Sequence, residues 1–264
     1  MSLSTVFVLP MPRFFIETSL RSLSVGAEWV LPERVYHHAV RVRRLRVGDV
    51  LTLFDGSGDS WRATLRHIGK NGASASIDTH IPTPSENAFA LTLALPLIAA
   101  DRMDWVLQKG TELGVRAFQL LYSERGGHLN NERLTRRVEH WRGVMIAACE
   151  QCGRNTLPEL LPLREMTEYL RAENSETLRV AFVVGGETSL SELLAKEREW
   201  NAAALLIGAE GGLSDTEKAI IGQAGWRSAH LGPRILRAET AAIVAVALTQ
   251  AAIGGLDHAM LQRI

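Results

Sequence analysis

The pattern of apolar and polar positions divides the chain into two parts of different character. Residues 11–80 contain short strand-like runs, separated by turn residues such as Asp55-Gly56. The expected strands span residues 13–16, 29–31, 50–54, 61–67 and 73–77. Between the second and the third of these runs, residues 32–40 predict a short helix with Pro32 at its start. This part is therefore expected to form a small β-rich unit.

From residue 89 onward the pattern changes to buried strands that alternate with helices. Strands are expected at residues 89–96, 115–122, 178–184 and 202–207, and helices at residues 102–113, 134–151, 190–198 and 240–253. This alternation predicts a mostly parallel sheet covered by helices on both faces. Residues 81–88 resemble a linker, so the expected domains are 11–81 and 88–264. Residues 1–10 are expected to be an extension or a cloning remnant.

Three strand exits in the second part carry glycine and charged residues. The run at residues 202–207 leads into glycines at positions 208, 211 and 212. Ser214 with Glu217 three residues later is a capping-box signature, so a further helix should begin there. Residues 231–240 and 185–187 form the other two exits. Because ligands of open α/β sheets bind at the carboxyl ends of strands, we expect the three loops to converge on one pocket.

The first of these loops suits a neutral or cationic ligand better than a phosphate. It lacks the Gly-Lys-Ser/Thr ending of a Walker loop and the Gly-x-Gly-x-x-Gly of a dinucleotide site, and Glu210 would repel phosphate. S-adenosyl-L-methionine (SAM) is a sulfonium cation that carries an adenosine, which glycine amides and apolar side chains can bind. The alternatives are that these glycines serve only as turn residues, and that Arg237 and Glu239 form an ordinary surface ion pair.

Charge and hydropathy narrow the partners. The 264 residues include 29 Lys and Arg and 29 Asp and Glu, so any nucleic-acid surface has to be local. The apolar runs are too short for a membrane span and no signal peptide is evident, which favours a cytoplasmic protein. The most basic segment, residues 41–46, follows Tyr36 and two histidines. It is either a solvated surface or, as we favour beside a compact β unit, a contact for RNA phosphates.

Cys149 and Cys152 form a Cys-x-x-Cys inside a helical pattern at residues 141–153. A redox pair usually follows a strand at the start of a helix, and a zinc site would need two further soft ligands. We therefore expect two buried or half-buried helix cysteines and no metal.

Two blocks of the sequence resemble the paired signatures of the RsmE family, 16S ribosomal RNA uridine-N3 methyltransferases of the SPOUT superfamily. They are Ile207–Ser214 (Ile-Gly-Ala-Glu-Gly-Gly-Leu-Ser) and Leu231–Ala241 (Leu-Gly-Pro-Arg-Ile-Leu-Arg-Ala-Glu-Thr-Ala). Supporting blocks lie at residues 12–15, 38–49, 55–56, 108–115, 123–125 and 148–154, so the resemblance extends from residue 11 to about residue 256. Ala209 and Ala238 replace a common Pro and Thr, and Gly127-His128 stands near a frequent Lys.

The resemblance implies an α/β, SPOUT-type domain with a carboxy-terminal trefoil knot, preceded by a small PUA-like β-barrel domain that binds RNA. It implies a homodimer that uses SAM to methylate N3 of a uridine in 16S rRNA of the small ribosomal subunit. Two other readings stay open. One is a non-catalytic RNA-binding or ribosome-assembly factor on the same fold, and the other is a nucleotide-binding metabolic enzyme.

The positions that match the family blocks give the expected site residues. For the cofactor they are Val184, Gly185, Gly186, Ile207, Gly208, Glu210, Gly211, Gly212, Leu231, Gly232, Ile235, Leu236, Arg237 and Thr240. For RNA they are Arg13, His38, Arg41, Arg43, Arg44, Arg46 and Arg125, and for catalysis Arg237, Glu239 and Arg154. Glu210 or Glu239 could take the uracil N3 proton, and an arginine at 237, 154 or 125 could stabilise the resulting anion. Among these, Arg237 with Glu239 is the favoured pair.

Overall fold

The computed structural model describes residues 11–82, 89–172, 177–186, 188–196 and 200–256. The chain divides into two compact units, residues 1–86 with 149–157 and residues 87–148 with 158–264. The segment 149–157, which we expected in the larger domain, thus belongs to the first unit. The expected extension at residues 1–10, most of the expected linker and Glu187 lie outside the described residues.

The first unit is a five-stranded sheet around an apolar core. Its strands are β1 (Arg13–Phe15), β2 (Glu28–Val30), β3 (Val50–Phe54), β4 (Ser60–Ile68) and β5 (Ala73–Ile81). They lie in the order β1-β3-β4-β5-β2, and only the β1–β3 pair is parallel. Phe14, Trp61 and Leu65 are among the fully buried side chains of the core. The β-rich character expected from the alternating runs is confirmed.

The short helix expected at residues 32–40 has an unusual continuation. Helix α1 (Glu33–Tyr36) passes directly into a π-helical turn, η1 (His37–Val42). The turn ends where the Arg43 amide donates to the His38 carbonyl oxygen at 2.9 Å, and Arg44 then takes a left-handed backbone conformation with φ of 58°. Because π-helical turns are rare and occur frequently at functional sites, this segment is a candidate for recognition.

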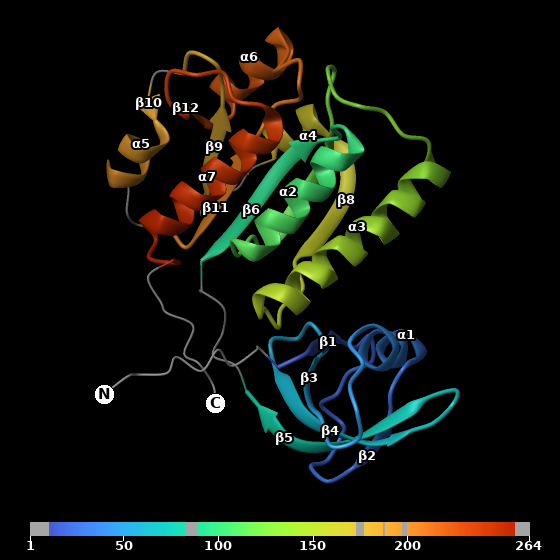
Figure 1. Cartoon of the computed structure of the whole chain (residues 1–264). Coiled ribbons are helices and arrows are strands. Elements are labelled where there is room, and N and C mark those ends of the chain that lie inside the picture. Colours follow the sequence, from blue (N-terminus) through green and yellow to red (C-terminus); the bar gives the residue numbers. More distant parts are fainter. Residues whose placement is uncertain (1–10, 83–88, 173–176, 187, 197–199, 257–264) are drawn as a thin grey trace. The chain divides into compact units, whose positions relative to one another are not determined.

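The second unit is a seven-stranded, wholly parallel sheet with the order β10-β12-β9-β11-β6-β7-β8 (Figure 1). Its strands are β6 (Ala90–Pro96), β7 (Ala117–Tyr122), β8 (Glu159–Glu165), β9 (Leu178–Phe182), β10 (Thr188–Ser189), β11 (Ala202–Leu206) and β12 (Arg227–His230). Its helices are α2 (Ala100–Glu112), α3 (Asn131–Cys152), α4 (Met166–Arg171), α5 (Leu190–Lys196), α6 (Asp215–Gln223) and α7 (Ala238–Ala252). The expected parallel α/β architecture is confirmed.

Helices cover both faces of this sheet. In Figure 1, α2 and α7 lie side by side in front of the central strands, and α7 buries Ala242, Ala245 and Val246. On the other face, α4 and α6 pack against alternate strand residues such as Ala94 and Leu206. This double cover explains why the central strands read as continuous apolar runs in the sequence.

Strand β8, helix α4 and strand β12 are not evident from the hydrophobic pattern. Strand β8 lies at the edge of the sheet, contains Pro162 and leaves its residues partly exposed, so it shows neither a buried run nor a clean alternation. The Gln119 side-chain amide donates to the Pro162 carbonyl oxygen at 2.8 Å, which supports the ladder at an irregularity in the β7–β8 register. Strand β12 spans only four residues, of which Ala229 alone is buried.

Candidate functional site

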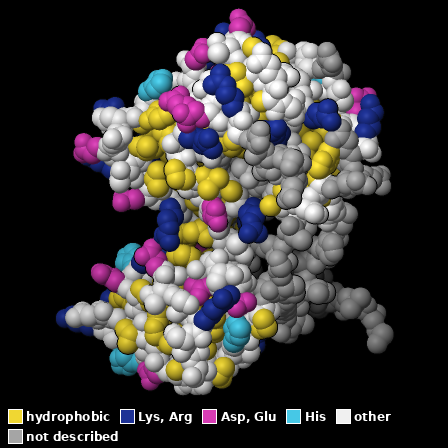
Figure 2. Space-filling model, turned by 180° about the vertical axis from the view of Figure 1, so that it is seen from behind, with side chains coloured by type: hydrophobic (Ala, Val, Ile, Leu, Met, Phe, Trp, Pro, Cys, Tyr) yellow, Lys and Arg dark blue, Asp and Glu magenta, His cyan; other side chains and the backbone are white. Residues whose placement is uncertain are grey.

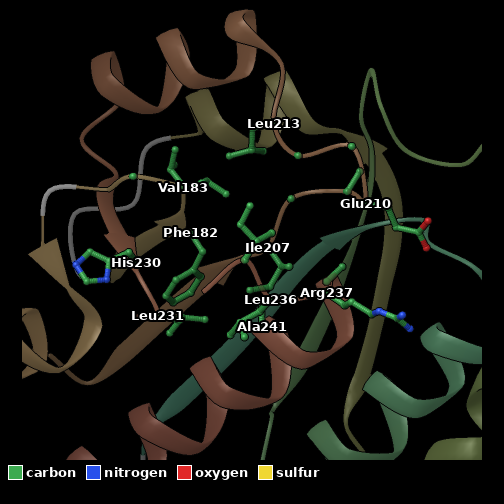
Figure 3. Close-up of a pocket in the computed structure, with 18 of the residues that line it drawn as sticks. Phe182, Val183, Ile207, Glu210, Leu213, His230, Leu231, Leu236, Arg237 and Ala241 are labelled. Atoms are coloured by element: carbon green, nitrogen blue, oxygen red, sulfur yellow. The ribbon is translucent and has the colours of Figure 1, made fainter. Parts of the chain in front are cut away.

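A cavity of about 950 Å³ opens at the carboxyl ends of β9, β11 and β12. Its walls are the loops that follow these three strands, so the convergence expected from the sequence is confirmed. Figure 3 shows Phe182, Ile207, Leu231 and Leu236 together at its centre; we call these four residues the apolar floor. Glu210 and Arg237 lie to one side of the apolar floor, and His230 lies to the other.

The β11–α6 loop has a tight backbone held by its own glycines. Gly212 has φ of 73°, and its amide donates to the Ala209 carbonyl oxygen at 2.8 Å. A Cβ on Gly208 would lie 3.2 Å from the Leu213 side chain. The loop then enters α6 through the expected capping box, in which the Ser214 hydroxyl accepts from the Glu217 amide at 3.1 Å. The local sequence therefore fixes both the turn and the start of the helix.

The β7–α3 loop supports this turn from outside. The Arg125 guanidinium donates to the carbonyl oxygens of Gly211 at 2.9 Å and Leu213 at 3.3 Å. The buried Glu217 carboxylate accepts from the amides of Ser214 at 2.7 Å and Glu124 at 3.3 Å. Arg125, which we expected to contact RNA, thus binds the glycine loop of the cavity in this structure.

The β9 exit requires glycine for steric reasons. A Cβ on Gly186 would lie 2.8 Å from the carbonyl carbon of Ala229 in β12, which is closer than real Cβ atoms come. Gly185 has φ of 80°, in the left-handed region. The neighbouring Val184 is 76% exposed, as is expected of an apolar side chain at the rim of a ligand site.

The β12–α7 loop supplies both apolar and charged groups. Gly232 has φ of 97°, and its amide donates to His230 Nδ1 at 3.1 Å. Ile235 is 83% exposed at the rim, whereas Leu231 and Leu236 point into the cavity (Figure 3). Arg237 is the N-cap residue of α7, and Glu239 lies in the first turn of that helix.

Four charged residues, Arg102, Glu210, Arg237 and Glu239, form what we call the charged end of the site. Arg102, from the first turn of α2, lies with Nη1 2.5 Å from Glu210 Oε1 and with Nε 3.8 Å from Glu239 Oε1. Arg237 is exposed and makes no ion pair with any residue in the described ranges. Glu239 therefore faces Arg102, whereas the sequence favoured Arg237 as its partner.

Most of the residues expected to hold a cofactor come together here. All of them except Gly186 and Thr240 line the cavity. Phe182, Arg102 and Lys218 also line it and were not anticipated. Phe182 is the last residue of a predicted strand and carries no signal of its own, but an arginine in the first turn of a helix after a strand is a detectable signal. Arg154 lies in the first unit, within the segment 149–157.

The residues expected to contact RNA fall into two groups in the first unit. Arg41, Arg43, Arg44 and Arg46 are exposed along and after η1, and Arg41 stacks on the Tyr36 ring with its guanidinium carbon 5.6 Å from the ring centroid. Arg13 instead turns inward, where its guanidinium donates to the Arg154 carbonyl oxygen at 3.2 Å and to the Asn155 side chain. Desolvation by burial lowers the pKa of Arg13 below its ordinary value.

Glu150 ties the segment 149–157 to the barrel strands and α1. Its carboxylate accepts from the Phe15 amide and the Arg34 guanidinium, both at 3.0 Å, and His38 Nδ1 lies 3.7 Å away. Cys149 is buried and Cys152 half-buried, both unpaired in disulfides, as expected for helix cysteines. His38 thus has a structural neighbour, which leaves the exposed arginines of residues 41–46 as the free cations of this surface.

Comparisons with known proteins agree with this geometry. A family model described as an RNA methyltransferase domain matches residues 85–250, and one described as an RNA methyltransferase PUA domain matches residues 31–78. Cavity and domain pair therefore define an RNA methyltransferase. The chain belongs to the ribosomal RNA small subunit methyltransferase E family, the RsmE family of the resemblance above.

Three relatives illustrate the match. The Neisseria gonorrhoeae ribosomal RNA small subunit methyltransferase E, solved bound to S-adenosyl methionine, is 36% identical, with a TM-score of 0.82 over 91% of this chain and 97% of that one. A Legionella pneumophila protein in complex with SAM is 30% identical, with a TM-score of 0.85 over 92% and 98% of the two chains. The Bacillus subtilis ribosomal RNA small subunit methyltransferase E is 27% identical over 89% of this chain and 94% of its own length.

Two further features of the described residues bear on partners. None of the helices in the described ranges combines the length and the hydropathy that a membrane crossing requires. Within the same ranges, no cluster of three or more His, Cys, Asp or Glu side chains is arranged to hold a metal ion.

Proposed function

We propose that this protein is a cytoplasmic, SAM-dependent methyltransferase that methylates N3 of a uridine in 16S rRNA of the small ribosomal subunit. The single observation that carries the proposal is the cavity at the three strand exits, with its apolar floor and its charged end. Family membership and the SAM-bound relatives give the same direction.

The residues of the cavity fit SAM. Its volume of about 950 Å³ falls within the range of cofactor pockets. The apolar floor can sandwich the adenine ring, and the glycine-rich backbones of the β9 and β11 exits allow close approach of their amides. Glu210 suits a sulfonium cation and would disfavour a phosphate ligand. When bound, SAM supplies an electrophilic methyl group that a nucleophile can displace in line.

We further propose that the chain ends of the second unit form a trefoil knot and that the domain boundary lies within residues 81–88. Three loops of one sheet that meet at one cavity support the first point. The family models, which match residues 31–78 and 85–250, support the second. The segment 149–157 is then a part of the methyltransferase sequence that packs with the PUA-like unit.

A homodimer is supported by exposed apolar side chains on neighbouring helices of the second unit. Trp105 of α2 is 46% exposed, and Leu248 of α7 and Val138 of α3 are each 37% exposed. Helices α2 and α7 pack against each other, so Trp105 and Leu248 belong to one helical layer. A second copy of the chain is the occupant we propose for this layer.

In the proposed reaction the protein positions the uracil and removes its N3 proton, and no covalent nucleophile is required. Glu239 is the proton acceptor that we favour, because it is only 13% exposed and lies at the charged end. The remaining arginines expected to act, Arg237 and Arg154, are proposed to contact the RNA near the target. The target base has to leave its stack, which single-stranded or bulged RNA permits.

Calorimetry followed by a transfer assay tests the proposal against its two competitors. SAM is expected to bind, whereas ATP and NAD are not; tight ATP or NAD binding without SAM binding would establish a metabolic nucleotide-binding enzyme instead. Labelled methyl groups are then expected to pass from SAM to small ribosomal subunits that lack the modification. SAM binding without any transfer would indicate a non-catalytic assembly factor.

A further inference from the structure

Arg102 is a charged residue of the cavity that lies outside the sequence blocks that resemble the RsmE family. It is the third residue of α2, directly after the N-terminal residues Ala100 and Asp101. A cation in the first turn of a helix opposes the helix dipole, and the N-cap residue Ala99 provides no side-chain hydrogen bond. Residues that break a local rule of this kind are expected at functional sites.

Arg102 joins carboxylates from two different loops. Glu210 comes from the β11–α6 loop and lies 2.5 Å from Nη1, and Glu239 comes from α7 and lies 3.8 Å from Nε. The second oxygen of Glu239, Oε2, is buried and accepts no hydrogen bond from any described residue. Since buried carboxylate oxygens are normally satisfied, Oε2 is an acceptor available to a donor that enters the cavity.

The other charged groups around this point have different partners. Arg125 donates to the carbonyl oxygens of Gly211 and Leu213. Arg237 is exposed, and in Figure 3 its side chain extends away from the apolar floor. Asp101, beside Arg102 on α2, is also exposed. Arg102, which is 31% exposed, is therefore the cation that contacts both site carboxylates.

We propose that Arg102 stabilises the uracil anion during methyl transfer while Glu239 accepts the N3 proton. This inference rests on the proposed function, because it assigns roles toward that function's substrate. The N3–H bond breaks and its proton passes to the Glu239 carboxylate. The N3 electron pair then forms the bond to the methyl carbon as the carbon–sulfur bond breaks, and that bond's electron pair stays on sulfur. The proton on Glu239 is afterwards released to water.

The electrostatics favour this division of roles. Proton transfer removes the negative charge from Glu239 and places it on the uracil, and Arg102 would lie beside both groups. The guanidinium therefore has an anionic neighbour before and after the transfer, so little reorganisation is required. The shorter contact with Glu210 holds the guanidinium in place throughout.

The test compares Arg102→Met and Arg102→Lys in the full-length protein with Lys109→Met. Lys109 is a matched control, because it lies on the same helix, is 34% exposed and pairs with Glu112 at 2.9 Å. We expect Arg102→Met to keep the wild-type SAM affinity in calorimetry and to slow single-turnover methylation at neutral pH on the order of 10²-fold. The deficit should shrink toward alkaline pH, where uracil loses its N3 proton without help. Arg102→Lys should recover part of the rate, and Lys109→Met should match the wild type.

Each other outcome contradicts the inference in a distinguishable way. A rate deficit of Arg102→Met that is equal at every pH would assign Arg102 a structural role. A large loss of SAM affinity would assign it to the methyl donor. If the wild type methylates uracil N3 and Arg102→Met does so at full speed, only the inference fails. If the wild type produces no N3-methyluridine, the proposed function itself fails.

Discussion

At the scale of single residues, the site depends on side chains that support glycines. Gly211 has the stem of Arg125 against it, since a Cβ added to Gly211 would lie 3.3 Å from Arg125 Cβ. The same arginine holds the Gly211 carbonyl oxygen through its guanidinium. The glycine therefore gives the ligand access to the backbone, and Arg125 keeps that backbone in one conformation.

Replacing Gly211 by Val should abolish SAM binding and leave the protein folded. The new side chain would displace Arg125 and fill the face of the loop that lines the cavity. Gly222→Ala is the matched control, because Gly222 lies in α6 with open space around it, and alanine there should stabilise the helix by about 0.5–1 kcal/mol. Calorimetry and thermal melting check both variants; unchanged SAM affinity in Gly211→Val would remove this loop from the site.

The residue scale also separates what the sequence predicts from what it does not. Glycines and charges at strand exits identify the loops, because the requirement for glycine is local in the backbone. The role of Arg102 is not local, since its partner Glu210 lies 108 positions away along the chain. Only the packing of α2 beside α7 brings the two loops to one arginine.

At the scale of elements, the predicted helices and central strands are confirmed where burial is periodic. The capping box of α6 is confirmed in both of its hydrogen bonds. The undetected elements, β8, α4 and β12, are short or lie at the sheet edge, so tertiary pairing stabilises them more than their own pattern. The π-helical turn η1 was expected as an ordinary helix, because no sequence rule used here distinguishes the two.

The start of α6 should be sensitive to its cap. Ser214→Ala removes the acceptor of the Glu217 amide and should destabilise the helix end by about 1 kcal/mol. Hydrogen exchange of the amides in the first turn of α6 measures this locally, and those amides should exchange about fivefold faster. Thr135→Ala on the exposed face of α3 is the control and should leave α6 unchanged. Unaltered exchange in Ser214→Ala would mean that the cap contributes nothing.

At the scale of the whole molecule, neutrality hides a local basic surface. Basic and acidic side chains are interspersed over the face shown in Figure 2, in agreement with equal numbers of 29 and 29. Within the described residues, Arg43, Arg44 and Arg46 are exposed and have no ion-pair partner. Counterion release by a few such arginines is sufficient for a phosphate contact, and net charge does not report it.

Reversing the charge of Arg43 and Arg44 together should weaken RNA binding and leave SAM affinity intact. The salt dependence of binding should fall by about 0.7 in log–log slope for each lost phosphate contact on single-stranded RNA. The double variant Arg133→Glu with Arg136→Glu makes the same change in net charge on exposed α3 and is the control. RNA titrations at several salt concentrations check the prediction. Equal binding and an equal slope in the Arg43/Arg44 variant would contradict an RNA contact at η1.

The most direct measurement identifies the methylated atom. Small ribosomal subunits that lack the modification are incubated with the wild-type protein and labelled SAM, and the product nucleoside is then identified by mass spectrometry and mapped in 16S rRNA. The account predicts N3-methyluridine at one position of 16S rRNA. A methyl group on another atom or another base, or no methyl group on 16S rRNA, would contradict it.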